Sequence, residues 1–538
     1  MSFTASLTVQ KVALALILLG GVILAPVFTV QILEGNPLPF LITMGILVSV
    51  FFLTVVGRQC WILMPAFLGL NGRLNFLPAN ISMVEFAILV SLALILYEAV
   101  FEKKLPESLG PPWFWVPSVL FLSIIAYHWI RSGDIGLRLF GGENFGGRKN
   151  WTMFLGFLAV PILFSLVRSD NPLLRWIPLF YFLGCVLDFI PFLITTLSPG
   201  LGPLIFRVYS SVNLDAYQDT LYGSFGGVDI VRVGNVGFFA YACQLMLLCY
   251  FPPKLWLRPI YWWCALGSIF SLLACIFSGF RSYLFRYVIA WGVALYGSSR
   301  WVTLLFIPAG ALSLAILVFG HGSLFHLPVA MQRTLSVFPG KWDQVALTSA
   351  EGSNSFREGI KRIYWAEYAP QAPWFGQGMT FSKEEATASL AEFYLEKAKT
   401  KIQAEDDMYR GFIERRQPHD GVVDVHLPTG WVGLALFAWL LTTCLIYIVR
   451  CIQKTPSDQM GPNRLWCSAM ILTEVFSYFV VYGDLSAALP RLFILMPLAI
   501  RSFEAWGQTT SSSLMPLDQG ESPALARKVS CSRESVER

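Results

Sequence analysis

Long apolar runs dominate the pattern of hydrophobic and polar positions along this chain. A helix needs about 20 mostly apolar residues to cross a bilayer. Thirteen runs approach or exceed this length: 12–33, 38–57, 81–101, 113–131, 151–168, 173–197, 231–251, 259–279, 282–298, 301–319, 429–450, 465–483 and 486–500. The pattern therefore predicts an all-α fold, a polytopic transmembrane helical bundle of about 12–14 spans.

The number of predicted spans depends on whether two stretches near the N-terminus cross the membrane. Residues 12–33 follow Lys11 like a signal peptide, but the run is long, has no clear small-residue cleavage site and leads directly into more apolar sequence. We expect a retained span there. Cys60–Leu70 is apolar but short, so it is either re-entrant or a short crossing. We favour a crossing, because the parity of the other spans otherwise leaves Met1 outside.

Lys and Arg residues in the short loops predict the orientation of the bundle, since cytoplasmic loops are enriched in them. One side collects Lys103, Lys104, Arg168, Arg175, Lys254, Arg258, Arg450, Lys454 and Arg464. The opposite side then holds 198–230, the turn at Gly279–Arg281 and the long segment 320–428. Loop 132–150 disagrees, because it places Arg138, Arg148 and Lys149 on that outer side.

The outer segment 320–428 is too long for a structureless loop. Ser382-Lys-Glu-Glu385 is a capping-box pattern, and apolar residues then recur at helical spacing, which predicts an amphipathic helix over 383–416. Most charges of this helix are expected to be ordinary solvated surface. The chain thus divides into an N-terminal membrane bundle (1–319), the outer segment (320–428), C-terminal spans (429–502) and a Ser-rich, disordered cytoplasmic tail (503–538).

Composition narrows the class of protein and the place of its function. The 538 residues are 55% hydrophobic and 14% charged, against about 25% charged in soluble domains. These values exclude a disordered chain, a fibre, a disulfide-stapled miniprotein and a typical soluble enzyme. Of the 73 charged residues, 26 lie between Gly320 and Pro428. Function is expected where the chain leaves the lipid.

Several common functional signatures are absent from the sequence. The net charge is only +5 and the basic residues form no stripe, so no nucleic-acid partner is expected. The ten cysteines include no CxxC pair, which argues against zinc ribbons and disulfides. We find no P-loop, GxSxG, HExxH or Rossmann glycine set. No acidic pair for a nucleotide-sugar metal is evident, and two histidines are too few ligands, so no cofactor or metal is expected.

Cationic residues of the outer face are the leading candidates for chemistry. Arg281 and Arg286 lie at and inside an apolar run, where a guanidinium is costly unless it is paired or faces a polar cavity. Arg232 opens another span on the same side, and Arg357 lies early in the outer segment. The planar guanidinium binds phosphate through two parallel hydrogen bonds, so converging arginines would suit a lipid-linked diphosphate. The alternative for Arg281 is an interfacial side chain that reaches the headgroups.

The histidines give one candidate for proton transfer. His419 precedes the span that begins near Thr429, and a histidine can accept a proton near neutral pH. The alternative is an ordinary polar loop residue, and the same holds for His426. His128, His321 and His326 lie at or near span ends and are expected to be structural.

Acidic residues in or beside spans raise a different function. Asp188, Glu474 and Asp484 occupy such positions. Intramembrane acids can carry ions or protons, so a multi-pass solute or ion transporter using Asp188 and Glu474 is the alternative hypothesis. Hydrogen bonds or ion pairs between helices would explain the same residues equally well.

An ordered set of motifs resembles the bacterial O-antigen ligase and O-antigen polymerase superfamily. The stretch 365–378 resembles its tryptophan-to-PlfGxG stretch, with Pro373, Gly376 and Gly378 as the element and Arg357 in the place of the preceding arginine. His419-Asp420 is followed at the family's intervals by Gly430 and Gly433. Ser278-Gly-Phe-Arg-Ser282 resembles an SRg turn, and Arg232-Val-Gly-Asn235 is a weaker match.

Three features depart from that family's pattern. Asp420 replaces the usual Asn, Val423 replaces a common Leu, and the interval between Gly378 and His419 is long. The long interval bears on the identity of the acceptor more than on the chemistry.

The resemblance implies a glycosyltransferase of the bacterial inner (cytoplasmic) membrane, with 320–428 as its periplasmic catalytic segment. The donor would be a glycan on undecaprenyl diphosphate. Arg281 and Arg357, with Arg286 and Arg232 as further candidates, would neutralise the diphosphate as the sugar–phosphate bond breaks. His419 would take the proton of an acceptor hydroxyl, without a metal.

The resemblance leaves the acceptor open, and other functions remain possible. Gly430 and Gly433 would let the chain turn tightly into its span and pack closely against a neighbour. The partners would be membrane lipids and a glycan or lipid acceptor. A ligase, a polymerase and a protein-glycosylating variant fit equally well, and a non-catalytic subunit of a polysaccharide export assembly is a third hypothesis.

Overall fold

The computed structural model describes residues 57–75, 81–101, 110–132, 147–211, 232–298, 300–380, 401–457, 459–480 and 483–513. The predicted span 12–33, nearly all of 38–57, the capping box at Ser382 and most of the C-terminal tail lie outside the described residues.

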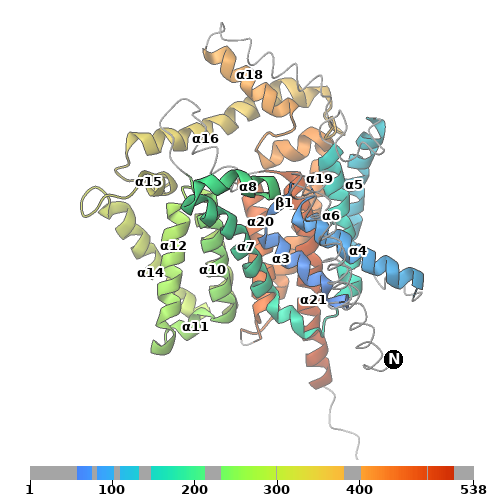
Figure 1. Cartoon of the computed structure of the whole chain (residues 1–538), viewed down its shortest axis with the longest axis horizontal. Coiled ribbons are helices and arrows are strands. Elements are labelled where there is room, and N and C mark those ends of the chain that lie inside the picture. Colours follow the sequence, from blue (N-terminus) through green and yellow to red (C-terminus); the bar gives the residue numbers. More distant parts are fainter. Residues whose placement is uncertain are drawn as a thin grey trace, which may run out of the picture.

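The described chain is helical almost throughout, which confirms the predicted all-α fold (Figure 1). The bundle consists of η2 (Gly57–Ile62), α3 (Leu63–Gly69), α4 (Met83–Phe101), α5 (Pro112–Arg131), α6 (Gly147–Leu166), η5 (Pro172–Trp176), α7 (Ile177–Leu197), α10 (Gly234–Tyr250), η7 (Pro259–Tyr261), α12 (Trp262–Phe277), α13 (Arg281–Ser298), α14 (Arg300–Gly320), α19 (Gly421–Lys454), α20 (Pro462–Val480) and α21 (Leu485–Ser513). Shorter or peripheral elements are β1 (Gly72–Leu74), η6 (Pro199–Leu201), α8 (Gly202–Val208), β2 (Tyr209–Ser211), α11 (Pro253–Trp256), α15 (Val329–Leu335), α16 (Gln344–Ile363), η8 (Tyr364–Tyr368), η9 (Ala369–Gln371) and α18 (Lys401–Glu414).

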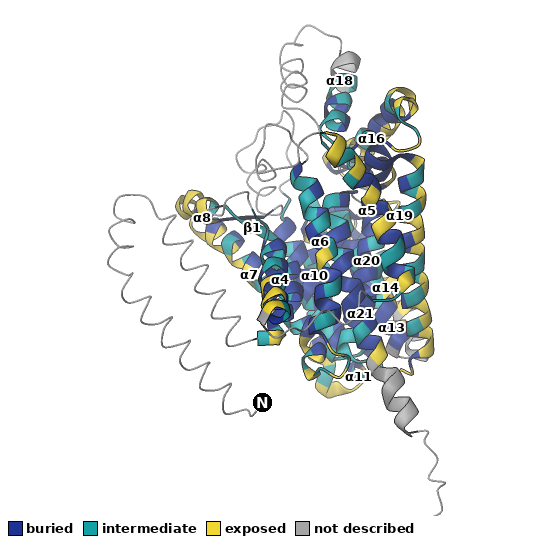
Figure 2. Cartoon of the chain, turned by 90° about the vertical axis from the view of Figure 1, so that its right-hand side faces the viewer, coloured by how far each residue is buried: buried dark blue, intermediate teal, exposed yellow. Residues whose placement is uncertain are grey.

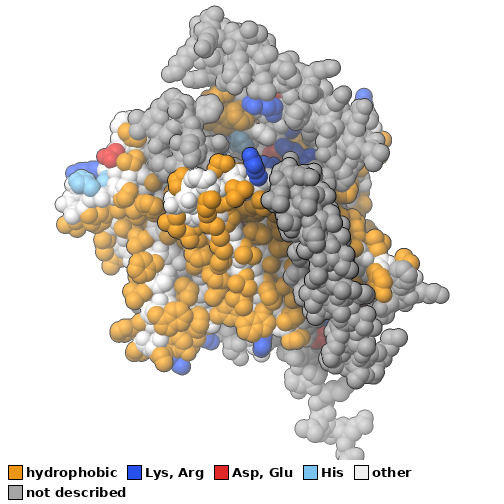
Figure 3. Space-filling view, in the orientation of Figure 1, with side chains coloured by type: hydrophobic (Ala, Val, Ile, Leu, Met, Phe, Trp, Pro, Cys, Tyr) orange, Lys and Arg blue, Asp and Glu red, His pale blue; other side chains and the backbone are white. Residues whose placement is uncertain are grey.

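Seven of the described helices are long and apolar enough to cross a membrane: Met83–Val100, Pro112–Arg131, Gly147–Leu166, Pro172–Leu197, Pro259–Phe277, Gly421–Lys454 and Leu485–Glu504. The other predicted spans within the described residues coincide with α10, α13, α14 and α20. Of these, α10 is an apolar helix of 17 residues, and the stretch Ile307–Gly320 of α14 is also apolar. Hydrophobic side chains cover the middle of the face in Figure 3, with Lys and Arg above and below. The chain is a multi-pass helical membrane protein.

Small residues bring the central helices close together. A Cβ on Gly184 of α7 would lie 1.8 Å from the carbonyl oxygen of Ala66, and one on Gly69 of α3 would lie 2.1 Å from that of Tyr181. Helices in lipid associate by close van der Waals packing, which small residues permit. The short helix α3 is therefore held against α7 (Figure 1), and buried residues gather in the middle of the bundle (Figure 2).

The stretch Cys60–Leu70 runs through the bundle. Before it, Arg58 donates to the Ser165 carbonyl at 2.7 Å and pairs with Glu98 at 3.5 Å, at the ends of α6 and α4. After it, β1 pairs antiparallel with β2, which follows α7 at the other end. This course agrees with the short crossing that we favoured from the sequence.

The two ends of the bundle differ in what they carry. One end, called here the site end, bears α15, α16 and α18, whereas α11 with Lys254 lies at the opposite end (Figure 1). Tyr250 of α10 bonds the Arg175 carbonyl at 3.0 Å, so the loops of Lys254 and Arg175 meet there, as expected.

Arg148, one of the three basic residues that disagreed with the charge rule, has a local partner. Arg148 forms a double hydrogen bond with the buried carboxylate of Glu85, and Thr152 donates to the same carboxylate at 2.7 Å. The positive charge of Arg148 is therefore balanced by an acid on α4.

The outer segment builds its own small core on top of the bundle. Ile360, Tyr364 and Ile413 are buried together with the first residues of α19. Arg410 of α18 bonds Glu367 at 2.8 Å. The described part of the predicted 383–416 helix, α18, is thus helical and amphipathic, and its charges pair mainly with α16 and η8.

Candidate functional site

Arg281 is the first residue of α13 and follows a tight turn at Gly279, whose φ is +77°. Its guanidinium donates to the Ala350 carbonyl and to the Asn354 side-chain oxygen, both at 3.2 Å and both on α16. Arg357 lies one turn beyond Asn354 on α16 and interacts electrostatically with Arg281. The structure therefore brings these two predicted residues together.

Arg333 of α15 ties this turn to α16, and the sequence did not single it out. Its side chain is 4% exposed and donates to Ser349 and Ser353 at 3.0 Å each, and to the Gly279 carbonyl. Burial, together with repulsion from three neighbouring arginines, lowers the pKa of Arg333 to about 9. It stays protonated at pH 7.

Arg232, Arg281, Arg333 and Arg357 form one group, called here the arginine cluster. Within the described part of the chain, the hydrogen bonds found for Arg281 and Arg333 go to carbonyl, amide and hydroxyl oxygens, which carry no charge. Cations crowded together repel one another, and an anion that binds among them relieves this repulsion. The cluster is therefore suited to a multiply charged anion such as a diphosphate.

His419 lies beside the cluster in the link from α18 to α19. The rings of Phe412 and Phe356 contact it, with centroids 5.8 and 6.3 Å away. Burial, and then Lys149 and Arg357, lower the pKa of His419 below its ordinary value, while Asp484 opposes them. Arg357 thus interacts with both His419 and Arg281, which links the predicted base to the arginine cluster.

The backbone at His419 is unusual. Among the described residues, Arg416 and His419 are the only non-glycine residues with positive φ, at 56° and 53°. Left-handed backbone is costly for residues other than glycine, and such strain gathers at functional sites. Asp420 then caps α19 by accepting from the Val423 N–H at 3.2 Å. Because Asn and Asp cap helices equally well, this departure from the family pattern keeps the local structure.

Two charged neighbours of His419 come from distant parts of the chain. A Cβ on Gly483 would lie 2.4 Å from the Cα of Gly421, so these glycines let the turn before α21 touch the start of α19. Asp484 is thereby placed near His419. Lys149 donates to the Arg416 carbonyl at 2.6 Å and adds positive charge beside the histidine.

Residues 373–378 and 427–432 bond to each other through their backbones where α19 is broken, in an arrangement called here the clasp. Gly430 has φ +63°, and the N–H groups of Trp431 and Val432 donate to the carbonyls of Pro373 and Trp374, at 2.8 and 3.1 Å. In return, the N–H groups of Gln377 and Gly378 donate to the carbonyls of Leu427 and Pro428 at 2.8 and 3.1 Å. Each segment satisfies backbone groups that the broken helix leaves without a partner.

The glycines of the clasp have little room for a side chain. A Cβ on Gly430 would lie 2.3 Å from the Trp374 backbone, and one on Gly376 would lie 2.4 Å from that of Pro428. We expected Gly433 to allow close packing against a neighbouring helix. A Cβ there would instead meet Thr429 of its own helix at 2.1 Å.

Gly430→Ala is expected to lower the free energy of unfolding by at least about 2 kcal/mol, because it adds both left-handed strain and a backbone clash. Thermal unfolding in detergent, followed by size-exclusion chromatography, measures this change. Gly310→Ala on α14 is the matched control, because nothing lies within 4 Å of its Cβ. Equal melting of both variants would contradict the clasp.

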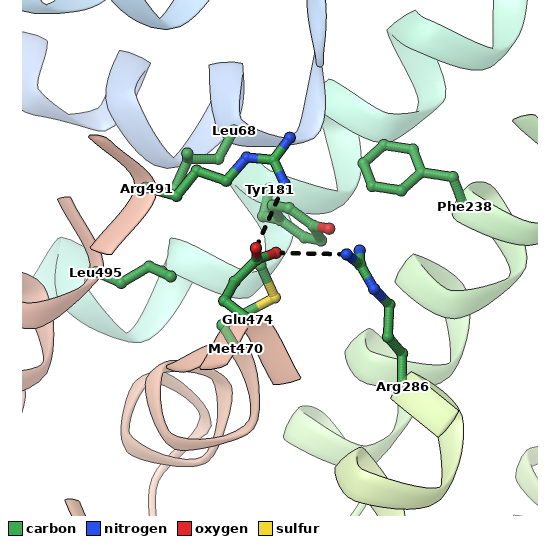
Figure 4. Close-up of a pocket in the computed structure, with 8 residues that line it drawn as sticks. All are labelled: Leu68, Tyr181, Phe238, Arg286, Met470, Glu474, Arg491 and Leu495. Atoms are coloured by element: carbon green, nitrogen blue, oxygen red, sulfur yellow. Dashed lines mark hydrogen bonds and ion pairs between the residues drawn. The ribbon is translucent and has the colours of Figure 1, made fainter. Parts of the chain in front are cut away.

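Arg286 lies apart from the arginine cluster, although we expected it to bind the diphosphate. Its guanidinium pairs with Glu474 at 3.9 Å, and Arg491 pairs with the same carboxylate at 3.4 Å (Figure 4). Arg491 also donates to Asn71 at 2.8 Å. The group lines a small cavity inside the bundle and joins α13, α20 and α21.

The remaining candidates have structural partners. Asp188 is buried and accepts from the Tyr209 hydroxyl at 2.5 Å and from Asn235 at 3.4 Å. His426 is buried and bonds the Tyr364 hydroxyl at 2.5 Å. His128 bonds the Phe375 carbonyl at 2.7 Å. His321 stacks on Trp342, and His326 contacts His321.

Comparison with protein-family models and with curated proteins does not identify the site. The chain matches no protein-family model, and no significant match is found among curated proteins. Within the described residues, no three His, Cys, Asp or Glu side chains gather as metal ligands. The assignment of function therefore depends on the geometry of the cluster and of His419.

Proposed function

We propose that the protein is an integral-membrane glycosyltransferase that moves a glycan from undecaprenyl diphosphate to an acceptor hydroxyl. The observation that carries the proposal is the arginine cluster, in which the described hydrogen bonds of Arg281 and Arg333 go to uncharged oxygens, beside a left-handed histidine at one end of a membrane bundle. In a bacterial inner membrane, this end would face the periplasm.

The chemistry uses the two parts of the site differently. The acceptor hydroxyl oxygen attacks the anomeric carbon, the bond from that carbon to the phosphate oxygen breaks, and the electron pair leaves with undecaprenyl diphosphate. His419 takes the hydroxyl proton. Arg281, Arg357 and Arg232 neutralise the charge that develops on the leaving group. The lowered pKa of His419 keeps its imidazole unprotonated at neutral pH.

Arg286 is left out of this mechanism. Its side chain is mostly buried beside Glu474, and removal of one partner of such a pair leaves an unbalanced charge. We assign it a structural role within the bundle.

The transporter hypothesis is less well supported by the same geometry. Glu474 is held by two arginines and Asp188 by hydrogen bonds within the fold. Both acids are therefore explained by ion pairs or hydrogen bonds between helices, without a role in transport. Ion-coupled solute uptake that depends on Asp188 or Glu474 would favour transport and count against the enzyme.

Arg333 is expected to act as a positioning residue for Arg281. Arg333→Gln and Arg333→Lys both remove the three-way contact with Ser349, Ser353 and Gly279, so both should raise KM for the donor by about tenfold, which corresponds to about 1.4 kcal/mol. Formation of undecaprenyl diphosphate by membrane vesicles measures this. Full rescue by Arg333→Lys would show that only the charge of Arg333 matters.

The direct test of the proposal is the fate of the donor in cells. Deletion of the gene is expected to leave glycan on undecaprenyl diphosphate, and the intact gene should release it. An unchanged pool of lipid-linked glycan after deletion would contradict a glycosyl-transfer function.

A further inference from the structure

The small cavity inside the bundle carries an unbalanced charge. The guanidinium groups of Arg286 and Arg491 both pair with the Glu474 carboxylate, at 3.9 and 3.4 Å (Figure 4). Arginine stays protonated in proteins, so two positive charges meet one negative charge and one positive charge is left over. The side chains of Arg286, Arg491 and Glu474 are only 16%, 24% and 9% exposed. Arg491 also lies within the apolar span Leu485–Glu504.

The other buried carboxylates of the described chain have partners elsewhere. Three of them pair with a different cation, namely Glu85, Glu98 and Asp420. The other two, Asp188 and Asp424, accept a hydrogen bond from a tyrosine hydroxyl. Within the part of the chain that the structure describes, Glu474 is thus the only carboxylate in an ion pair with Arg286 or Arg491.

The two arginines have more hydrogen-bond donors than their described contacts use. Each guanidinium carries about five N–H groups. Besides Glu474, Arg286 donates to the Ser477 hydroxyl at 3.3 Å and Arg491 to the Asn71 side-chain oxygen at 2.8 Å. N–H groups of both cations therefore remain for an acceptor in the cavity that they line.

The cavity has room for one small particle. Its volume is about 10 Å³, which is close to what a single water molecule needs. A phosphate or a carboxylate ligand is much larger. Apart from the charged groups and Tyr181, the cavity is lined by the apolar side chains of Leu68, Phe238, Met470 and Leu495. The occupant that fits both the size and the charge is a monatomic anion.

We propose that this cavity binds a chloride ion, which Arg286 and Arg491 hold and which balances their excess charge. A water molecule of similar size would leave that charge uncompensated, which is costly inside a membrane bundle. The ion would help to join α13, α20 and α21. The site is separate from the arginine cluster, so it does not depend on the proposed glycosyl transfer.

The chloride dependence of thermal unfolding tests the site. The full-length protein is purified in detergent and heated in chloride or in gluconate at equal ionic strength, because gluconate is too large for the cavity. The melting temperature should be higher in chloride by about 3 °C or more, since an ion that binds only the folded state stabilises it. Bromide should replace chloride. Equal melting in chloride and gluconate would overturn the proposal.

Charge variants assign the effect to this cavity. Arg491→Gln leaves one cation for one carboxylate, so its melting should not depend on chloride. Glu474→Gln leaves two unbalanced cations, so its chloride dependence should exceed that of the wild type. Arg464→Gln is the control and should keep the wild-type dependence, because Arg464 donates to the carbonyls of Gln459 and Ser502.

The two charge variants shift the chloride dependence in opposite directions, so either one can contradict the proposal. Wild-type dependence in Arg491→Gln, or loss of the dependence in Glu474→Gln, would show that chloride acts elsewhere. If Arg491→Gln does not fold, Glu474→Gln decides alone.

Discussion

His419→Ala is expected to lower the rate of glycan transfer by about 10²–10⁴-fold, the usual contribution of a general base. The acceptor hydroxyl would then lose its proton acceptor, while the arginine cluster would still bind the donor. The change should therefore appear in kcat, with KM for the donor little altered. His326→Ala is the control, since His326 contacts His321 and lies outside the cluster. Equal activity of both variants would contradict the role of His419.

The pH dependence provides a separate check on His419. Because its pKa is lowered, the imidazole is already neutral at pH 7 and can accept a proton. Activity should therefore be level around neutrality and fall as the pH drops through this lowered pKa, where His419 becomes protonated. An acid limb that persists unchanged in an Asp484→Asn variant would contradict the influence of Asp484 on His419, since removal of that charge should move the limb to still lower pH.

Arg281→Gln is expected to weaken donor binding by about 100-fold, because a hydrogen bond from a charged group contributes up to about 3 kcal/mol. Arg281→Lys keeps the charge but loses the planar fork, so it should restore only part of the affinity. Arg362→Gln on α16 is the control, because that arginine is 62% exposed and pairs with Asp406. Binding of undecaprenyl diphosphate to the purified protein measures all three variants.

Arg286→Gln makes a contrasting prediction. Because Arg286 pairs with Glu474 inside the bundle, its loss should lower the melting temperature and leave the affinity of folded protein for the donor nearly unchanged. A specific loss of donor affinity in a protein that melts normally would return Arg286 to the binding site.

The fold was largely predictable because it depends on local hydrophobic pattern. Runs such as 113–131 and 465–483 became α5 and α20 nearly residue for residue. The short stretch Cys60–Leu70 was harder, because its path depends on close packing of Gly69 and Gly184 against α7 and α3. Such contacts between distant residues leave no periodic signal in the sequence.

The site was predictable only where motifs marked it. Arg281, Arg357 and His419 stood in recognisable spacing. Arg333 lay in a short helix that no motif marks, and its role follows from serines on α16. For Arg286 the sequence pointed to the wrong site. Its position five residues after Arg281 pointed to the same site, yet one and a half helical turns separate the two side chains, and Glu474 holds the second.

The most direct test of the central claim is complementation of a gene deletion by His419→Ala and Arg281→Gln, with surface polysaccharide displayed on a gel. We predict that neither variant restores the wild-type ladder, although both are present in the membrane at normal amounts. Loss of all long polymer would assign a polymerase, and accumulation of long lipid-linked polymer would assign a ligase. A normal ladder from both variants would contradict the account.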